Sequence, residues 1–323
     1  MFTKFVPHSP RRTFLFVITL LAAFTLFLAV PEPSVADAKS TKTLRTPAPN
    51  ELRPLNLGAF TGILTIVWGD GAPSSSDTRV LYLLTDENGA TRELRLSQET
   101  ARLAGAFLDL NRQRVQVQGV ALGEMNANGT TPLIQAHSIQ RVSVGDAAMV
   151  PTVSGPQPWI TVMCKFSDVS AEPKDLNYFQ STYGSSYPAL DHYWRQVSYN
   201  QINLNGSGAV GWYTLPHARS HYVPSSGSAD LDALFDDCVA AADSAVNYNN
   251  YLGINMMFND NLDCCAWGGG RYTTLDGTTK VWYTTWQPPW SFENLTISSH
   301  EMGHGFGLPH SSGDYGQVYD NVW

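Results

Sequence analysis

Residues 300–310 read HEMGHGFGLPH, and this stretch decides what the rest of the chain has to frame. His300 and His304 are four residues apart, so on a helix both imidazoles project from one face and can reach the same ion. Glu301 is turned away from that face, yet it stays close enough to act on a water molecule beside the ion. The sequence thus predicts a metal-binding helix with Glu301 as its general base.

Gly307 predicts where this helix ends. Glycine adopts positive φ without steric cost, which stops a helix and lets the chain fold back. The return would bring His310 to the same ion as a third ligand. Three histidines leave one coordination position of a zinc ion open for water, as in catalytic rather than structural zinc sites.

The spacing H-E-x-x-H-x-x-G-x-x-H is more specific than H-E-x-x-H alone. The alternative is that the three histidines are unrelated, either solvated on the surface or hydrogen-bonded in a core. The spacing makes this alternative the weaker one. The stretch resembles the active-site helix of metzincin zinc endopeptidases. HSSG at residues 310–313 resembles the gametolysin-like group of that family more than astacins or serralysins.

The resemblance implies a fold, a cofactor and a reaction. It implies Zn²⁺ as cofactor, Glu301 as catalytic residue, and hydrolysis of peptide bonds in a protein or peptide substrate. Residues 159–323 would form a metzincin-type α/β zinc peptidase subdomain. The implied metal ligands are His300, His304 and His310.

The resemblance is incomplete at its C-terminal end. Metzincins carry a methionine turn after the third histidine, whereas no methionine follows His310 in the sequence, and Met302 lies inside the helix. We therefore expect a catalytic domain that is truncated at its C-terminus. Either the sequence is a piece of a longer protein, or that subdomain is absent.

Composition and charge narrow the class of protein. The chain has 323 residues, 43% of them hydrophobic and 15% charged, which is enough for two modest domains with cores. Its formal net charge is -8. An acidic chain is not expected to bind nucleic acid.

Residues 1–38 are typical of an export signal. Arg11 and Arg12 precede the apolar run at residues 14–30, and Ala-Asp-Ala at 36–38 offers small residues for cleavage before Lys39. A membrane anchor is the alternative, because the run is only slightly shorter than the ~20 residues that span a bilayer. The cleavage site favours a secreted protein without a stable membrane partner, exported by either the general or the twin-arginine route.

Residues 39–54 are expected to be a flexible spacer, and residues 55–142 a β-rich domain. Together with the α/β peptidase subdomain that follows, this predicts an α+β chain. Turn signals at Gly69-Asp70-Gly71 and at 86–89 (DENG), the second a hairpin candidate, separate short strand-like runs. Five such runs predict a small β-barrel or sandwich, OB-like, that serves as a prodomain or accessory domain. The runs are 62–68, 80–84, 92–96, 115–120 and 133–137.

Residues 143–158 are rich in Pro, Gly and Ser and predict a linker where processing can occur. Residues 39–158 contain no cysteine. A thiolate from this region therefore cannot cap the zinc, and any inhibition by it must use steric occlusion or another ligand.

The peptidase segment predicts alternating strands and helices. We expect strands at 159–166, 254–258 and 281–286, and helices at 174–183, 187–198 and 231–246. The last of these has the clearest apolar face by spacing, and the histidine helix is expected to begin near Phe292, after Pro288-Pro289. The apolar face comprises Leu231, Leu234, Phe235, Cys238, Val239 and Ala242.

All four cysteines lie in the C-terminal half, which in an exported protein indicates two disulfides. Adjacent cysteines rarely pair with each other, because disulfide geometry normally needs more widely spaced Cα atoms. We therefore expect Cys164 and Cys238 each to bond to one of Cys264 and Cys265. A cysteine zinc site is the alternative, but the spacing does not match paired C-x-x-C knuckles.

The main functional alternative is a secreted binding or adhesion protein whose zinc site is vestigial or structural. A zinc hydrolase that acts on nonpeptide amides is a further alternative. The sequence does not indicate the oligomeric state or the substrate preference.

Overall fold

The computed structural model describes residues 57–73, 75–104, 107–125, 131–142, 153–225 and 227–310. The predicted export signal, the spacer, most of the linker and the HSSG segment after its histidine lie outside these residues. The described chain has a mixed α/β fold built on a sheet of ten strands. No helix in the described ranges is long and apolar enough to cross a membrane.

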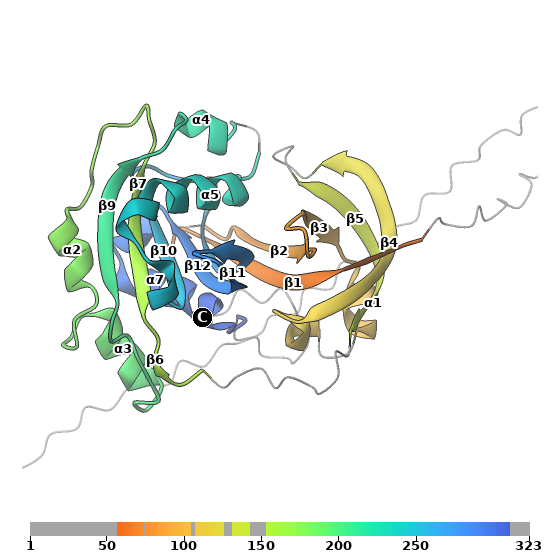
Figure 1. Cartoon of the computed structure of the whole chain (residues 1–323), viewed down its shortest axis with the longest axis horizontal. Helices are drawn as coiled ribbons and strands as arrows, with labels where there is room; N and C mark the ends of the chain where they lie inside the picture. Colours follow the sequence, from red (N-terminus) through yellow and green to blue (C-terminus); the bar gives the residue numbers. More distant parts are fainter. Residues whose placement is uncertain are drawn as a thin grey trace, which may run out of the picture. The chain divides into compact units, whose positions relative to one another are not determined.

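Residues 57–142, called here the β module, supply five strands of this sheet (Figure 1). Each of these strands is paired with two others of the five, so the pairings close into a ring around an apolar core. The elements are β1 (Gly58–Gly71), β2 (Thr78–Thr85), β3 (Thr91–Arg95), α1 (Gln98–Leu103), the 3-10 helix η1 (Phe107–Leu110), β4 (Arg114–Met125) and β5 (Pro132–Arg141).

The five predicted strands of the β module are confirmed, and so is the hairpin at residues 86–89, which joins antiparallel β2 and β3. The turn predicted at Gly69-Asp70-Gly71 is wrong. These residues continue β1, because they pair with a second strand, β11 (Cys265–Leu275), far along the chain.

Residues 153–310, called here the α/β part, supply the other half of the sheet. Its central strands are parallel, as the connecting helices allow, and β11 runs antiparallel to them. The elements before β11 are β6 (Gly155–Pro156), β7 (Trp159–Lys165), α2 (Leu176–Ser181), α3 (Leu190–Val197), β8 (Ile202–Asn203), β9 (Gly208–Thr214), α4 (Arg219–Tyr222), α5 (Leu231–Ala242), η2 (Asp243–Ala245), η3 (Tyr248–Asn250) and β10 (Gly253–Phe258). After β11 follow β12 (Thr278–Gln287), α6 (Pro289–Phe292) and α7 (Leu295–Phe306).

The sheet has the strand order β2-β3-β5-β4-β1-β11-β12-β10-β7-β9. The junction between its halves is the antiparallel pairing of Trp68–Gly71 in β1 with Cys265–Gly268 in β11. The two predicted folding units therefore share one hydrogen-bonded sheet. No short local pattern signals a pairing between such distant strands.

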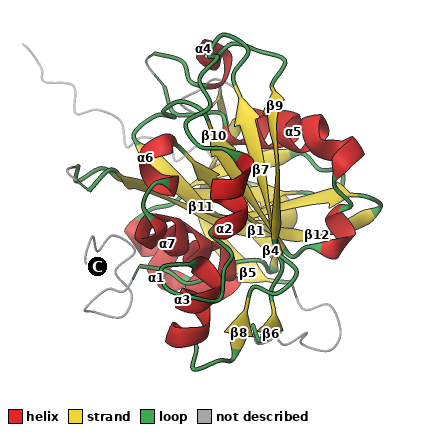
Figure 2. Ribbon diagram, turned by 90° about the vertical axis from the view of Figure 1, so that its left-hand side faces the viewer, coloured by secondary structure: helices red, strands yellow, loops and turns green. Residues whose placement is uncertain are grey.

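Helices cover both faces of the sheet in the α/β part (Figure 2). Successive side chains of a strand point to opposite faces, and Ile160, Val162 and Cys164 of β7 pack in the same core as α5. Trp159 of β7 instead packs with the side chains of α7. Helices α5 and α7 thus lie on opposite faces, and α7 packs against β11 and β12.

The predicted apolar face of α5 is confirmed, because all six of its members are buried. The histidine helix, however, begins at Leu295 rather than near Phe292. Its N-cap is Asn294, whose side chain accepts a hydrogen bond from the Thr296 N–H, and the proline pair leads instead into the separate short helix α6.

The predicted disulfide connectivity is wrong. Cys164 bonds to Cys238, and Cys264 bonds to its neighbour Cys265. Cys164 lies on the face of β7 that packs against α5, where the Cα atoms of Cys164 and Cys238 are 5.8 Å apart, within the usual disulfide range. All four cysteines are therefore oxidised, and no thiolate remains for the alternative cysteine zinc site.

Candidate metal centre

Four side chains converge at the C-terminal half of α7: His300, His304, His310 and Asp70. One ligand atom from each lies within 4.8 Å of the ligand atoms of the others. The three predicted histidines are thus brought together, and the structure adds a carboxylate from the β module. This largely buried set could hold one metal ion.

Helix α7 presents two of the histidines from one face. The Nε2 atoms of His300 and His304 are 3.1 Å apart, as the spacing of four residues predicts. Gly307 then adopts φ 96°, and the Leu308 N–H donates to the Gly303 carbonyl, which closes the helix with a Schellman motif. This positive φ was predicted, and it turns the chain back so that His310 reaches the other two.

Asp70 comes from β1 and meets all three imidazoles with one oxygen. Its Oδ2 lies 3.0 Å from Nε2 of His300, 3.1 Å from Nε2 of His310 and 3.3 Å from Nε2 of His304. Burial acts to raise the pKa of this carboxyl, but its interactions with the surrounding histidines prevail and hold the pKa well below its usual value. Asp70 is therefore an anion at neutral pH.

The tautomer of His304 points to a cation among these atoms. Its Nδ1 lies 2.7 Å from the Leu308 carbonyl oxygen, which can only accept a hydrogen bond, so Nδ1 carries the proton. Burial lowers the pKa of His304, more than Asp70 raises it, and the neutral ring leaves a lone pair on Nε2. That lone pair faces the Asp70 carboxylate and another imidazole nitrogen, an arrangement that a cation bound between them would stabilise.

Glu301 is fully buried beside this cluster. Neither of its carboxylate oxygens has a hydrogen-bond partner among the described residues. Burial raises its pKa well above the usual value, and the negative charge of Asp70 raises it further. An unpartnered buried carboxylate is costly to keep in a folded protein, so Glu301 is a strong candidate for a group that handles protons.

Two further residues of the β module contact the centre. Trp68 stacks on His304 with ring centroids 5.5 Å apart and packs at 4.8 Å against His310. Arg112 donates hydrogen bonds to the carbonyls of His304 and Gly305 at the C-terminal end of α7, where a positive charge is favourable.

Sequence reasoning missed Asp70, Trp68 and Arg112. Gly69-Asp70-Gly71 was interpreted as a turn, and Asp70 is 230 positions from the first histidine that it contacts. The only local signal is that Trp68 and Asp70 are two apart and so share one face of an extended strand. That signal does not identify which partner the face meets.

Among the described residues, the other histidines do not join the centre. His217 and His221 pack against each other with ring centroids 4.0 Å apart. A second group, Asp263 with Cys264 and Cys265, has its ligand atoms close together. Its two sulfur atoms are already bonded to each other, so it offers no thiolate for a metal.

No protein-family model matches this chain, and no curated protein matches it either. The chemistry of the centre is therefore inferred from its residues and their geometry.

Proposed function

We propose that this chain is a secreted, zinc-dependent endopeptidase. The observation that carries the proposal is the convergence of three imidazole Nε2 atoms next to Glu301, a buried carboxylate without a hydrogen-bond partner. A binding protein has no evident need for such a carboxylate. A hydrolase needs a general base in this position.

The donor set and its spacing favour zinc as the ion. Imidazole nitrogens and a carboxylate oxygen are common zinc ligands, and zinc sites of four ligands are tetrahedral. Bonds of ~2.0–2.1 Å in a tetrahedron place neighbouring ligand atoms roughly 3.3–3.4 Å apart. The separations of 3.0 to 3.3 Å from Asp70 Oδ2 to the three Nε2 atoms are close to this value.

The residues around the ion have distinct roles in the proposed reaction. A zinc ion bound there supplies Lewis-acid chemistry that activates water and polarises the scissile carbonyl. Glu301 takes a proton from the attacking water and later delivers it to the leaving amine. The burial that raises the pKa of Glu301 suits a carboxylate that must hold this proton near neutral pH.

The other parts of the chain have roles consistent with export and processing. Two disulfides are typical of proteins that leave the cytoplasm. The β module is proposed to be an OB-like prodomain, since its five strands pair in a closed ring with a helix between the third and fourth strands.

The test uses the purified chain and two glutamate variants. Zinc content is measured by elemental analysis. Casein hydrolysis is measured in chains that also carry Asp70→Ala, because a catalytic zinc site has three protein ligands and keeps its fourth position open for water. We expect about one zinc per chain in every variant, and a loss of about 10²–10⁴-fold in hydrolysis for Glu301→Gln, the range for general acid–base catalysis. Glu293→Gln, at an exposed glutamate paired with Lys174, is the matched control and should keep full activity.

Two results would reject the proposal. Full activity of Glu301→Gln would show that Glu301 is not the general base. A chain that binds zinc but cleaves no casein even without Asp70 would indicate a structural metal site in a binding protein, or a hydrolase for nonpeptide amides.

A further inference from the structure

The fourth side chain of the candidate metal centre comes from a different part of the chain than the three histidines do. Asp70 belongs to the β module, whereas the histidines belong to the α/β part. Trp68 and Asp70 project from the same face of β1. The first packs over His304 and His310, and the second reaches all three imidazoles with one oxygen. A catalytic zinc site keeps its fourth position open for water.

Strand β1 also covers the sheet edge beside the centre. Asp70 is paired with Ala266 of β11, and Trp68 with Gly268, directly beneath Glu301 of α7. Each edge of a strand can pair with only one neighbouring strand. Extended peptides bind proteins by pairing with an edge that is free. While β1 is in place, this stretch of β11 cannot pair with a peptide, so a substrate has to reach the metal without that pairing.

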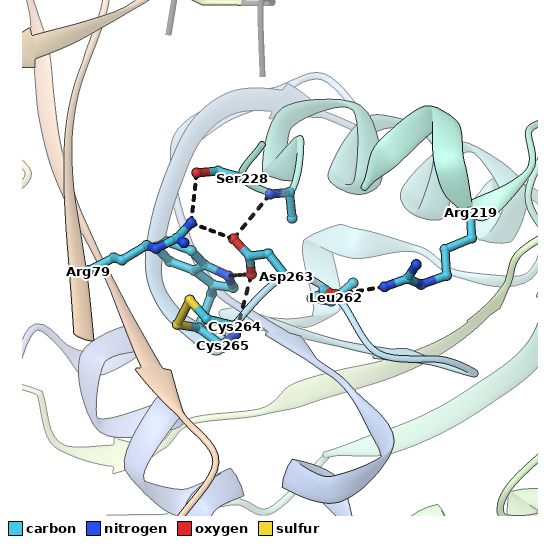
Figure 3. Close-up of polar contacts among 9 residues, drawn as sticks. Arg79, Arg219, Ser228, Leu262, Asp263, Cys264 and Cys265 are labelled. Carbon is cyan, nitrogen blue, oxygen red and sulfur yellow. Dashed lines mark hydrogen bonds and ion pairs between the residues drawn. A yellow bond between two sulfur atoms is a disulfide. The ribbon is translucent and has the colours of Figure 1, made fainter. Parts of the chain in front are cut away.

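Two arginines of the β module fix it on the α/β part at separate points. Arg112 binds the carbonyl end of α7, and its guanidinium lies 4.6 Å from the ring centroid of Tyr283. Figure 3 shows Arg79 reaching from β2 to Asp263 and Ser228, next to the Cys264–Cys265 disulfide at the start of β11. The module is therefore held both at the end of α7 and at the start of β11.

We propose that the β module keeps the metal centre closed, with Asp70 as a removable fourth ligand and β1 as the occupant of the neighbouring sheet edge. The inference rests on the metal-binding part of the proposed function. Residues 39–158 contain no cysteine that could supply a thiolate for this purpose. The carboxylate of Asp70 performs the role instead: its loss opens the position beside the metal, and separation of β1 from β11 frees the neighbouring sheet edge.

The test asks whether a small ligand can reach the metal in the full-length chain. Co²⁺ replaces zinc because its visible absorption reports changes in coordination, and acetohydroxamate, a small metal chelator, is the probe. We expect no spectral change for the wild-type chain at acetohydroxamate concentrations that saturate Asp70→Ala, so that the variant binds at least ~10-fold more tightly, a change of about 1.4 kcal/mol. Asp77→Ala removes a carboxylate from the nearby β1–β2 connection, where it contacts Ser75, and should behave as the wild type.

Folding is checked by near-ultraviolet circular dichroism, and Asp70→Asn is the second variant because it keeps the side-chain size. An amide oxygen is a weaker ligand than a carboxylate, so this variant should also bind acetohydroxamate more tightly than the wild type. Equal binding to the wild type and both Asp70 variants would overturn the proposal. Loss of Co²⁺ from well-folded Asp70 variants would also overturn it, because Asp70 would then be an indispensable ligand.

The two proposals fail in different ways. If the Asp70 variants gain acetohydroxamate binding but cleave no casein, the closing role stands and the peptidase function fails. If the wild-type chain binds acetohydroxamate as well as the variants do and all of them cleave casein, the peptidase function stands and the closing role fails.

Discussion

Gly268 of β11 sets how closely the histidine helix can approach the sheet. A Cβ atom at this position would lie 2.3 Å from the backbone oxygen of Glu301 and 2.9 Å from its Cα. These are backbone atoms of α7, so they cannot move aside as the end of a side chain can. The absence of a side chain at residue 268 is thus what lets α7 hold its histidines over β1.

Gly268→Ala should therefore lower the free energy of unfolding by about 1–3 kcal/mol, the usual cost of overpacking a core. It should also weaken zinc binding, because α7 is pushed away from Asp70. Urea denaturation and zinc titration check the two effects. Gly208→Ala is the control, since a Cβ there meets no atom within 4 Å, and a loss of equal size in that variant would contradict the explanation.

Tyr183 is a second residue whose surroundings control its chemistry. Its hydroxyl lies 2.7 Å from Thr161 Oγ1 and accepts a hydrogen bond of 2.8 Å from Asn255 Nδ2. Burial raises the pKa of Tyr183 to about 12, although these two hydrogen bonds partly oppose the rise. The hydroxyl thus resists ionisation in the folded state more than in the unfolded state.

This difference predicts a loss of stability at alkaline pH. The contribution of Tyr183 is fully present below its unfolded pKa of about 10, and it is lost as the pH rises towards the folded pKa of about 12. Between pH 10 and pH 12 the free energy of unfolding of the wild type should fall by on the order of 2 kcal/mol through this residue, and Tyr183→Phe should not show that fall. Urea denaturation at several pH values measures it, and Tyr199→Phe, at an exposed tyrosine, is the reference for removing a hydroxyl. Identical slopes for wild type and Tyr183→Phe would contradict the assignment.

At the scale of the element, α7 is a short helix whose two ends are both fixed. Asn294 caps its first turn, and Gly307 ends it in the left-handed conformation. A hydrogen-bonded series of buried polar side chains also links it to the sheet, because Ser298 donates to Gln287, which in turn donates to Thr285. The end at Gly307 matters most for the metal, because it sets the path of the chain to His310.

Replacing Gly307 tests this point. Ala is strained at φ 96° by about 1–2 kcal/mol, whereas Asn tolerates the left-handed region better. We expect Gly307→Ala to lose about that much stability and to bind zinc more weakly than Gly307→Asn. Because both variants carry a Cβ next to Arg112, the comparison isolates the backbone conformation. Equal zinc affinity and stability in the two variants would show that the helix end does not depend on φ.

Local patterns were sufficient to predict several elements but not their assembly. The β-module strands and α5 have clear apolar periodicity, and the spacing in α7 identifies three of the four converging side chains. Strand β11 was missed because Gly268, Gly269 and Gly270 interrupt its apolar pattern. Gly268 allows a close approach to α7 and Gly269 allows one to β1, and only the folded chain reveals both. Asp70 escaped prediction for the related reason that its partners depend on the β1–β11 pairing.

At the scale of the whole molecule, the two disulfides differ in the length of chain that they close. Cys164 and Cys238 are 74 positions apart and connect β7 to α5, whereas Cys264 and Cys265 are adjacent. Loop-closure entropy in the unfolded chain grows with the length of the closed loop. The first disulfide should therefore contribute far more to stability than the second.

The double variant Cys164→Ala/Cys238→Ala should lose roughly 4 kcal/mol of unfolding free energy, from a closed loop of that length. The double variant Cys264→Ala/Cys265→Ala should lose roughly 1 kcal/mol or less, because it opens almost no loop. Guanidinium denaturation measures both. Losses of similar size would instead support the crossed connectivity, in which each distant cysteine bonds to one of the adjacent pair.

The β1–β11 pairing has one more consequence. All four cysteines lie in the α/β part, so no covalent bond other than the main chain joins it to the β module. A single backbone cut between residues 142 and 153 would give a nicked protein whose fragments remain associated through shared backbone hydrogen bonds. The fragments should comigrate in native gel filtration and separate in denaturant without any reducing agent.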